Sequence, residues 1–487
     1  MKNRFFTTAF RHGRPLTTLA LLLAAVAAGA QTPASFAPVR TYSAGAGSRP
    51  RGIAVGDVNG DGRPDLVTAN DGNGTAGVLL GQAGGGFAAV STYSTGANSY
   101  PISIAVADVN GDSRPDLVTA NNNNTGTVGV LLGQASGGFA AVNAYSTGGV
   151  YPFSIAVGDV NGDGRLDLIT ANIGDNTTGV LLGQAGGGFA PGSTYSTGGV
   201  YPVGTAVGDV NGDGRPDLVA ANYGNTVGVL LGQAGGGFAA VSTYFTGPNS
   251  GPNGSNSSPG GVTLADLNGD GRLDLITANY YGNTAGVLLG QAGGGFAAVS
   301  TYSTGAFSYP QGIAVGDVNG DGRPDLVTAN GGNGTAGVLL GQAGGGFAAA
   351  STYSTSASLG PQGIAIADVN GDGRPDLVTA NDGSNTVSVL LNTGTYTPLT
   401  AAPTTPANDV VLFPNPTHGG FAVQLPAAWG ASSARAELRN ALGQEMTLQV
   451  WSGRGAFIFA TEGLAPGVYV LRVQAAGKTL LRRVVLN

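Results

Sequence analysis

The sequence predicts an all-β protein in which a ring of repeated four-stranded units is followed by a small β-sandwich. Of the 487 residues, 87 are Gly and only 10% are charged, which argues against a coiled coil. Hydrophobic residues make up 42% of the chain and the net charge is only −7, so there is enough apolar material for a core, which argues against simple disorder. One segment pattern recurs seven times between residues 36 and 397.

Charge divides the chain into three parts. Residues 1–35 carry four bases and no acid (+4), residues 36–400 carry 24 Asp and ten Arg (−14), and residues 401–487 carry four acids and seven bases (+3). The polyanionic middle part disfavours binding to nucleic acid or to an anionic membrane surface. The absence of Cys excludes disulfides, thiolate metal sites and a Cys nucleophile.

The N-terminal segment predicts a secretory signal peptide at residues 1–30. Bases up to Arg14 precede an apolar run at residues 16–27, and Ala28-Gly29-Ala30 follows as a cleavage site. This run is too short for a stable anchor, and no later segment approaches about 20 consecutive apolar residues, so we expect no membrane span in the mature chain. A buried N-terminal helix is the alternative interpretation.

A repeat of about 51 residues organises the middle of the chain. In the first copy, the apolar run 53–55 precedes an acidic motif, and the segments 65–70, 77–81 and 87–93 follow it, separated by turns rich in Gly and Asn. Short runs rich in Val, Leu, Thr, Phe and Tyr suit strands, so we expect four strands per unit and about 28 in all. The motif Asp-x-Asn-Gly-Asp-x-Arg-x-Asp starts at Asp57, Asp108, Asp159, Asp209, Asp266, Asp317 and Asp368.

The order of the segments favours a closed ring over an open solenoid. Four-stranded units of this size have to stack on one another to bury their apolar faces. The Phe-containing strand first occurs at Phe36, before the first acidic motif, whereas the last unit ends at residues 387–391 without such a strand. Closure lets the segment near Phe36 complete the seventh unit and removes both exposed edges. The sequence therefore predicts a seven-bladed β-propeller over residues 36–397.

Each acidic motif has the ligand spacing of a calcium loop. Oxygen ligands at positions 1, 3, 5, 7 and 9 suit Ca²⁺, and Gly at position 6 permits the sharp turn. Position 12, which is Glu in an EF-hand, is Thr68 here, and a strand follows, so the loop is only a relative of the EF-hand loop. The alternative is that Asp, Asn and Gly simply form turns. The ligands predicted in the first loop are Asp57, Asn59, Asp61, Arg63 through its backbone carbonyl, and Asp65.

Seven intact copies favour the calcium interpretation over the turn interpretation. We expect about seven ions with a structural role, whose charge would cancel the −14 of residues 36–400. Ser113 replaces the Gly of position 6 in the second loop, so we expect the weakest site there, because a left-handed non-Gly residue costs about 1 kcal/mol. The ligands predicted in the other six loops are Asp108, Asn110, Asp112, Arg114, Asp116, Asp159, Asn161, Asp163, Arg165, Asp167, Asp209, Asn211, Asp213, Arg215, Asp217, Asp266, Asn268, Asp270, Arg272, Asp274, Asp317, Asn319, Asp321, Arg323, Asp325, Asp368, Asn370, Asp372, Arg374 and Asp376.

On these residues the chain resembles the FG-GAP or VCBS repeat family, the calcium-loop propellers of integrin α-subunit heads, some fungal lectins and many bacterial surface proteins. The resemblance covers about residues 36–397 and rests on the acidic loop between two strands and on the Gly-Gly-Gly-Phe turn. It implies a seven-bladed propeller used for recognition or adhesion, and it identifies no ligand.

Residues 36–400 offer little for catalysis. This part of the chain has no His, Glu, Lys or Cys, which general acid–base chemistry normally uses. Its only Asp residues outside the acidic loops are Asp71, Asp175 and Asp382, which lie in turns where Asp is common. We therefore expect no enzyme activity.

Binding has better candidates in the turns that join one blade to the next, on the face opposite the acidic loops. Tyr in these turns, with nearby Asn122, Asn123 and Asn225, can stack on and hydrogen-bond a sugar or a peptide. The alternative is that the Tyr side chains only cover the blade junctions. The fifth turn, 247–260, is six residues longer, and is either functional or a tolerated insertion. The candidate ligand-binding residues are Tyr100, Tyr151, Tyr201 and Tyr309, each directly before a Pro.

The C-terminal part is set apart by a Pro-, Thr- and Ala-containing linker at residues 398–408. Alternating segments in residues 409–487 predict a small β-sandwich. Its motifs resemble the type IX secretion sorting domain of Bacteroidota, which implies passage through the outer membrane and removal of the domain. Arg482 and Arg483 either take part in sorting or form a solvated strand end. The motifs that carry the resemblance are 413–416, 436–443, 463–473 and 478–487.

These predictions describe an exported, calcium-stabilised propeller that acts outside the cell or on its surface as a binding or adhesion module. Its expected partners are an unidentified extracellular ligand, a glycan or a protein, and the type IX secretion machinery. The alternative is a purely structural surface protein without a dedicated ligand.

Overall fold

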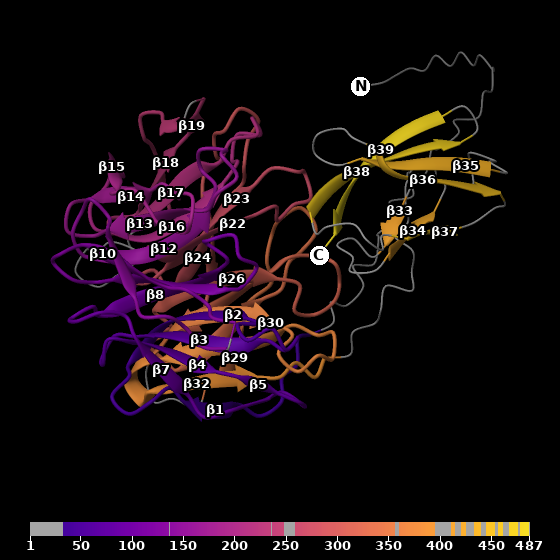
Figure 1. Ribbon diagram of the computed structural model, residues 1–487. Helices are drawn as coiled ribbons and strands as arrows, with labels where there is room; N and C mark the ends of the chain where they lie inside the picture. Colours follow the sequence, from indigo (N-terminus) through magenta and orange to yellow (C-terminus); the bar gives the residue numbers. More distant parts are fainter. Residues whose placement is uncertain are drawn as a thin grey trace, which may run out of the picture. The chain divides into compact units, whose positions relative to one another are not determined.

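The computed structural model describes residues 33–135, 137–234, 236–247, 259–355 and 360–394, together with strands between residues 411 and 486. The chain divides into two compact units, Met1–Tyr396 and Thr397–Asn487. The first unit is a ring of seven four-stranded sheets (Figure 1), which confirms the predicted all-β class and the seven blades. The predicted signal peptide and the linker lie outside the described residues.

Each blade is an antiparallel meander whose first strand lines the centre of the ring and whose fourth strand lies at the rim. The innermost strands are β2 (Pro50–Gly56), β8 (Pro101–Ala107), β12 (Pro152–Gly158), β16 (Pro202–Gly208), β22 (Pro259–Ala265), β26 (Pro310–Gly316) and β30 (Pro361–Ala367). The second strands are β3 (Asp65–Asn70), β9 (Asp116–Asn121), β13 (Asp167–Asn172), β17 (Asp217–Asn222), β23 (Asp274–Asn279), β27 (Asp325–Asn330) and β31 (Asp376–Asn381).

The two middle strands of every blade form the core, since the second strand is buried at every residue and the third at all but its first. The third strands are β4 (Thr75–Leu79), β10 (Thr127–Leu131), β14 (Thr177–Leu181), β18 (Thr226–Leu230), β24 (Thr284–Leu288), β28 (Thr335–Leu339) and β32 (Thr386–Leu390). The outermost strands are β7 (Ser91–Ser94), β11 (Asn143–Ser146), β15 (Ser193–Ser196), β21 (Ser242–Phe245), β25 (Ser300–Ser303), β29 (Ser351–Ser354) and β1 (Arg40–Ser43). A single 3₁₀ turn (η1, Asp382–Ser384) and two-residue pairs near the acidic loops complete the described elements of the ring: β5 (Gly81–Gln82) with β6 (Gly86–Phe87), and β19 (Gly232–Gln233) with β20 (Gly237–Phe238).

The N-terminal segment closes the ring. Strand β1 pairs with β32, so that Arg40 lies opposite Val389 and Ser43 opposite Thr386. Phe36 also forms a bridge with Asn392. The innermost strands β2 and β30 pack against each other like any other neighbouring pair, so the predicted closure of the ring by the N-terminal segment is confirmed.

An aromatic pair links each blade to the next around the rim. Tyr93 of the first blade meets Phe139 of the second edge-on, with ring centroids 5.2 Å apart. The prediction of a continuous strand over residues 87–93 was wrong in one respect: the strand starts at Ser91, because Phe87 bridges Gly81 and packs against Tyr42 of the preceding blade. The other pairs are Tyr145–Phe189, Tyr195–Phe238, Tyr244–Phe296, Tyr302–Phe347 and Tyr353–Phe36.

A buried Asn at the end of the second strand gives a further connection between neighbouring blades at five of the seven junctions. Asn121 donates its Nδ2 to the backbone carbonyl of Thr95 in the preceding blade and accepts a hydrogen bond from Thr119. Asn70, Asn222 and Asn279 make corresponding contacts with the preceding blade. These amides are fully or almost fully buried and therefore fix the spacing between blades.

The second unit contains two antiparallel sheets, in agreement with the predicted β-sandwich class. One sheet has the order β33–β34–β37 and the other β36–β35–β38–β39. No helix in the described part of either unit is long and apolar enough to cross a membrane. The strands are β33 (Val411–Phe413), β34 (Gly420–Gln424), β35 (Ser433–Arg439), β36 (Glu445–Ser452), β37 (Ala456–Ala460), β38 (Gly467–Ala475) and β39 (Lys478–Leu486).

Candidate functional site

The acidic loops lie between the first and second strand of each blade and are organised around the carboxylate of position 1. Asp57 accepts hydrogen bonds from the backbone N–H groups of Gly60 at 2.8 Å, Asp61 at 3.1 Å and Gly62 at 2.7 Å. Gly60 and Gly62 have φ of 75° and 80°, which explains why Gly suits these positions. The same contacts with the Asp of position 1 recur in all seven loops.

The Asp at position 9 is buried and joins the loop to the rest of the blade. Asp65 accepts a hydrogen bond from Val58 N–H at 2.9 Å and another from Gly81 N–H, at the end of the third strand, at 2.7 Å. Burial raises its pKa, and the nearby charges of Asp61 and Asp57 act in the same direction. Burial likewise raises the pKa of Asp325 to about 7 and that of Asp376 to about 6.

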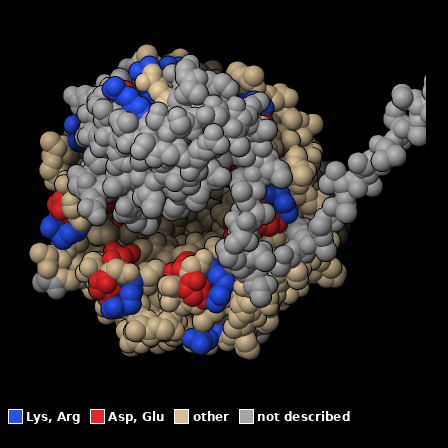
Figure 2. Space-filling view, turned by 90° about the vertical axis from the view of Figure 1, so that its right-hand side faces the viewer, with Lys and Arg blue, Asp and Glu red and all other residues tan. Residues whose placement is uncertain are grey.

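Positions 5 and 7 form an ion pair on the surface. Arg63 donates its Nε to the carbonyl of Gly81 at 3.0 Å and places a terminal guanidinium nitrogen on the Asp61 carboxylate. Burial acts to raise the pKa of Asp61, but hydrogen bonds from Asn59 and Arg63 outweigh it and lower the pKa. All seven loops contain this ion pair, and one face of the propeller shows acidic and basic side chains side by side in separate clusters around a hollowed centre (Figure 2).

The structure tests how well these loops suit a cation. In the first loop the predicted ligands Asp57, Asn59 and Asp61 lie on one tight turn, and Asp65 begins the strand that follows. Their oxygens are of the kind that Ca²⁺ prefers. Among the described residues, however, no three acidic or His side chains converge as a group that would hold a metal ion. The donor types therefore fit calcium, while the carboxylates here accept hydrogen bonds from the loop backbone and from Arg.

The second loop differs from the others as expected. Ser113 has φ of 66°, so it holds the left-handed conformation that Gly adopts at position 6 of the other loops, and this part of the prediction is confirmed. Its N–H still donates to Asp108, at 2.7 Å, so the loop keeps its shape at the cost of backbone strain.

On the opposite face, the four candidate Tyr residues share an unusual backbone conformation. Tyr100, Tyr151, Tyr201 and Tyr309 have φ between 43° and 55°, in the left-handed region. The first three are 49%, 42% and 54% exposed, so about half of each side chain is accessible to a ligand. A Cβ added to Gly174 would come within 2.9 Å of the Tyr151 ring, so this ring lies against the backbone of the neighbouring turn.

Two of the four belong to a larger aromatic group, which we call the tyrosine cluster. The Tyr201 and Tyr223 rings are 6.3 Å apart, and the hydroxyl of Tyr223 donates to that of Tyr281 at 3.2 Å. Tyr280 contacts Tyr281 at 4.8 Å and Tyr309 at 5.2 Å between ring centroids. The hydrogen bond from Tyr223, together with burial, raises the pKa of Tyr281 to about 12. The cluster comprises Tyr201, Tyr223, Tyr280, Tyr281 and Tyr309.

Sequence reasoning missed three members of this cluster. Tyr223, Tyr280 and Tyr281 follow the buried Asn of the second strand, in the same turn as the Asp and Asn of other blades. A position-by-position comparison of the seven repeats would have singled them out, because this turn is among the most variable parts of the repeat. Of the longer fifth turn, 247–260, residues 248–258 lie outside the described residues.

Other turn residues also differ from their expected roles. Asn225 is only 5% exposed, so it is not available to a ligand as proposed from the sequence. Asp382 is more than a turn former, since it accepts a hydrogen bond from Arg49 Nε at 2.9 Å and lies 333 residues from it in the sequence. Asp71 lies 3.2 Å from Arg51, and Asp175 accepts a hydrogen bond from Val150 N–H at 2.7 Å.

The closed ring of four-stranded blades with one acidic hairpin loop per blade defines a β-propeller built from internal repeats. The chain belongs to the FG-GAP-like repeat family, whose seven matches together span residues 57–415. A secretion system C-terminal sorting domain matches residues 411–487, so the protein is directed by type IX secretion to the extracellular space or the cell surface. The repeats match residues 57–119, 108–170, 159–220, 209–277, 266–328, 317–379 and 368–415.

Solved structures share the fold at low sequence identity. The crystal structure of BBS1N in complex with ARL6DN, soaked with mercury, matches with a TM-score of 0.50 and 12% identity, over 75% of this chain and 99% of that chain. The lead-soaked crystal of the same complex matches with a TM-score of 0.50 and 12% identity, over 74% and 97%. An Agrocybe aegerita lectin that recognises non-reducing terminal N-acetylglucosamine has a TM-score of 0.44 and 19% identity, over 69% and 86%. No curated protein matches the chain.

Proposed function

We propose that this secreted or surface-displayed propeller is a binding module that recognises glycans through the Tyr-bearing face of the ring. The observation that carries the proposal is the set of exposed Tyr side chains at strained backbone positions. No catalytic step is part of the proposed function.

Backbone strain supports a functional role for these Tyr residues. A left-handed conformation costs a non-Gly residue roughly 1–2 kcal/mol, and Gly360 shows that Gly serves at the corresponding position of the last blade. Tyr at four of these positions therefore carries a backbone cost that Gly would avoid. Strain that the rest of a fold tolerates is concentrated at functional sites.

The tyrosine cluster supports a carbohydrate ligand in particular. Its rings offer flat apolar surfaces, while the hydroxyls of Tyr223 and Tyr281 offer hydrogen-bonding groups beside them. This combination suits a sugar, which has an apolar face and polar edges. Tyr100 and Tyr151 lie on other blades, so further weak sites on one ring would increase the avidity for a polymeric glycan.

We also propose that calcium ions in the acidic loops stabilise the ring. Each loop places an Asp carboxylate of raised pKa near two other carboxylates, and a divalent cation would offset their mutual repulsion. In the first loop the ligands would be Asp57, Asn59, Asp61, Asp65 and the carbonyl of Arg63, with equivalent residues in the other six. The ion would contribute charge neutralisation and hold the hairpin together.

A glycan array probed with the full mature chain tests the binding proposal. We expect binding to be weakened about tenfold or more by the double variant Tyr201→Ala and Tyr223→Ala, since stacking on aromatic rings would be lost. Phe245→Ala is the matched control, because Phe245 is an exposed aromatic residue of the outermost strand β21. An array without any binding would favour a purely structural surface protein, and equal losses in both variants would also contradict the proposal.

A further inference from the structure

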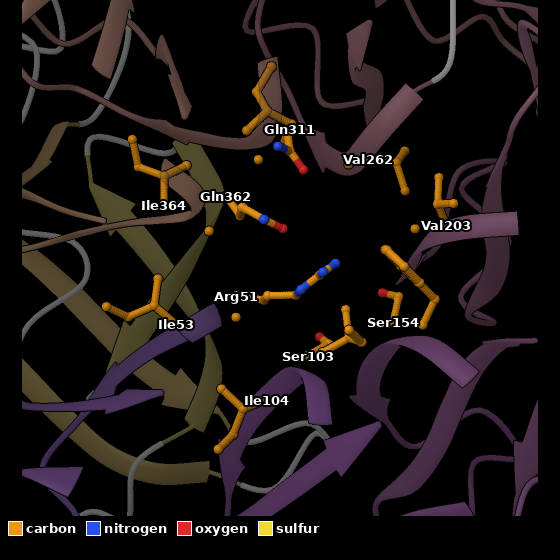
Figure 3. A pocket seen from close by; sticks show the side chains of 18 of the residues that line it. Arg51, Ile53, Ser103, Ile104, Ser154, Val203, Val262, Gln311, Gln362 and Ile364 are labelled. Carbon is orange, nitrogen blue, oxygen red and sulfur yellow. The ribbon is translucent and has the colours of Figure 1, made fainter. Parts of the chain in front are cut away.

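A pocket lies at the centre of the ring, apart from both the acidic loops and the tyrosine cluster. It has a volume of about 210 Å³ and is lined by residues at the second to fourth positions of the seven innermost strands. Figure 3 shows Arg51, Gln311 and Gln362 pointing into it from one side, with Val203 across from Arg51 and Gln362. An apolar cavity of about 150 Å³ accommodates benzene, so this pocket has room for one aromatic or branched aliphatic group.

At the position after the strand-opening Pro, the lining is polar on one side of the pocket, called the polar half, and apolar on the other, called the apolar half. Gln311, Gln362 and Arg51 follow the strand-opening Pro in the sixth, seventh and first blades, which are neighbours in the closed ring. The same position is Ile, Phe and Val in the second, third and fourth blades. Repeats that keep identical residues at all five ligand positions of the acidic loops thus diverge around the pocket. In the apolar half this position holds Ile102, Phe153 and Val203, and Ser103, Ser154 and Thr205 line the pocket further along the same strands.

Arg51 is the only charged residue among those that line the pocket, and it is held in place from outside. Its Nε lies 3.2 Å from Asp71 but makes no hydrogen bond of good geometry, and its Nη2 lies 4.0 Å from Asp382. Asp382 is already held by Arg49 at 2.9 Å and by Gln362 Nε2 at 2.7 Å. The two acids balance the charges of Arg49 and Arg51, while the N–H donors of the Arg51 guanidinium remain weakly engaged.

The polar half presents an ordered pair of complementary groups. The Arg51 guanidinium offers N–H donors of the fixed geometry that matches a carboxylate. Gln362 uses its Nε2 on Asp382, so it presents its amide oxygen, an acceptor, to the pocket beside Arg51 (Figure 3). A carboxylate next to an N–H group, with an apolar side chain directed away from both, would satisfy the two halves at once.

We propose that the central pocket binds an N-acylated amino acid with a free carboxylate and an apolar side chain, the chemistry found at the C terminus of a peptide. Arg51 binds the carboxylate, Gln362 accepts the N–H of the acylamino group, and Phe153 with its apolar neighbours covers the side chain. This site is independent of the proposed glycan site, because no member of the tyrosine cluster lines the pocket.

Isothermal titration of the full mature chain with N-acetyl-L-phenylalanine tests this proposal, and N-acetyl-L-phenylalaninamide serves as the uncharged control. We expect the acid to bind about tenfold more tightly than the amide, because only the acid forms the charge-assisted contacts. Arg51→Gln and Phe153→Ala each reduce binding of the acid about tenfold. Arg40→Gln, which removes one exposed charge on β1, leaves it unchanged.

A peptide ending in Ala-Ala-Phe with a free carboxylate distinguishes the two sources of this chemistry. Tighter binding than N-acetyl-L-phenylalanine identifies a peptide C terminus as the ligand, and equal binding identifies a small acylated amino acid. Melting temperatures of the variants separate loss of binding from loss of folding. Equal binding of acid and amide, no binding at millimolar concentration, or full binding by a folded Arg51→Gln variant would overturn the proposal.

Discussion

The two faces of the propeller differ in how closely their residues repeat from blade to blade. On the face of the acidic loops, the seven copies repeat the same residues at positions 1, 3, 5, 7 and 9 and the same hydrogen bonds. On the other face, the residue before the strand-opening Pro is Arg, Tyr, Tyr, Tyr, Ser, Tyr and Gly from the first blade to the last. The acidic loops are equal in length in all seven blades, whereas the turns of the other face differ in both length and side chains.

This contrast separates the residues that stabilise the ring from those proposed to bind a ligand. A loop that connects strands within its own blade has the same task seven times, so one solution serves all copies. The turn face requires only a compatible backbone, and its side chains have diverged blade by blade. The following predictions test whether stability depends on the first face and recognition on the second.

Removal of calcium is expected to have the largest effect. A dissociation constant near 10⁻⁴ M in about 1 mM calcium adds about 1.4 kcal/mol per site, or about 10 kcal/mol for seven independent sites. Chelation should therefore lower the melting temperature by roughly 10 °C or more. Calorimetry with excess EDTA and with restored calcium measures this change. A melting temperature that does not change on chelation would contradict the proposal that calcium stabilises the ring.

Substitutions on the two faces should differ clearly in their effect on the free energy of unfolding. Asp217→Ala leaves the N–H groups of Val210 and Gly232 without their buried acceptor, so we expect a loss of about 2–5 kcal/mol in the free energy of unfolding. Tyr201→Ala, on the turn face, should change it by less than about 0.5 kcal/mol. Chemical denaturation of both variants provides the comparison, and similar losses for the two would contradict the separation of roles.

The second acidic loop offers a smaller and matched test. Ser113→Gly removes the left-handed strain but adds conformational freedom to the unfolded chain, so we expect a gain of at most about 1 kcal/mol. Gly164→Ser in the third loop, where Gly has φ of 82°, should lose a similar amount. Thermal unfolding in saturating calcium measures both. Changes in stability of the same sign in both variants would contradict the idea that a left-handed non-Gly residue at position 6 costs stability.

The smallest effect concerns the tyrosine cluster. Its Tyr281 has a pKa raised to about 12 chiefly by the hydrogen bond with Tyr223, so Tyr223→Phe should bring that pKa down towards 10. Because the folded state keeps the hydroxyl protonated, the contribution of this group to stability is complete below pH 10 and declines as the pH rises towards 12. Ultraviolet titration of tyrosinate formation follows the change, with Tyr42→Phe as a control from the rim.

Sequence reasoning succeeded where one repeat contains the whole pattern. The strands, the acidic loops, the clasp by the segment near Phe36 and the left-handed Ser113 all follow from spacing within or at the ends of the repeats. It failed where the contact partner belongs to another blade. Arg49 and Asp382 are 333 residues apart, and Phe87 leaves the predicted strand because of Tyr42 in the neighbouring blade. Such contacts depend on how side chains of neighbouring blades meet in the closed ring, which spacing within one repeat does not determine.

Pairing of β1 with β32 also limits when the ring can close during folding. The first strand of the ring to be synthesised finds its partner only when residues up to Leu390 have emerged, and the hydroxyls of Ser35 and Thr393 then meet at 3.1 Å across 358 residues of chain. Before β1 pairs with β32, both strands expose edges without a hydrogen-bonding partner, and the ring stays open. The blade that completes the ring is therefore made from both ends of the propeller, and neither end can form it alone.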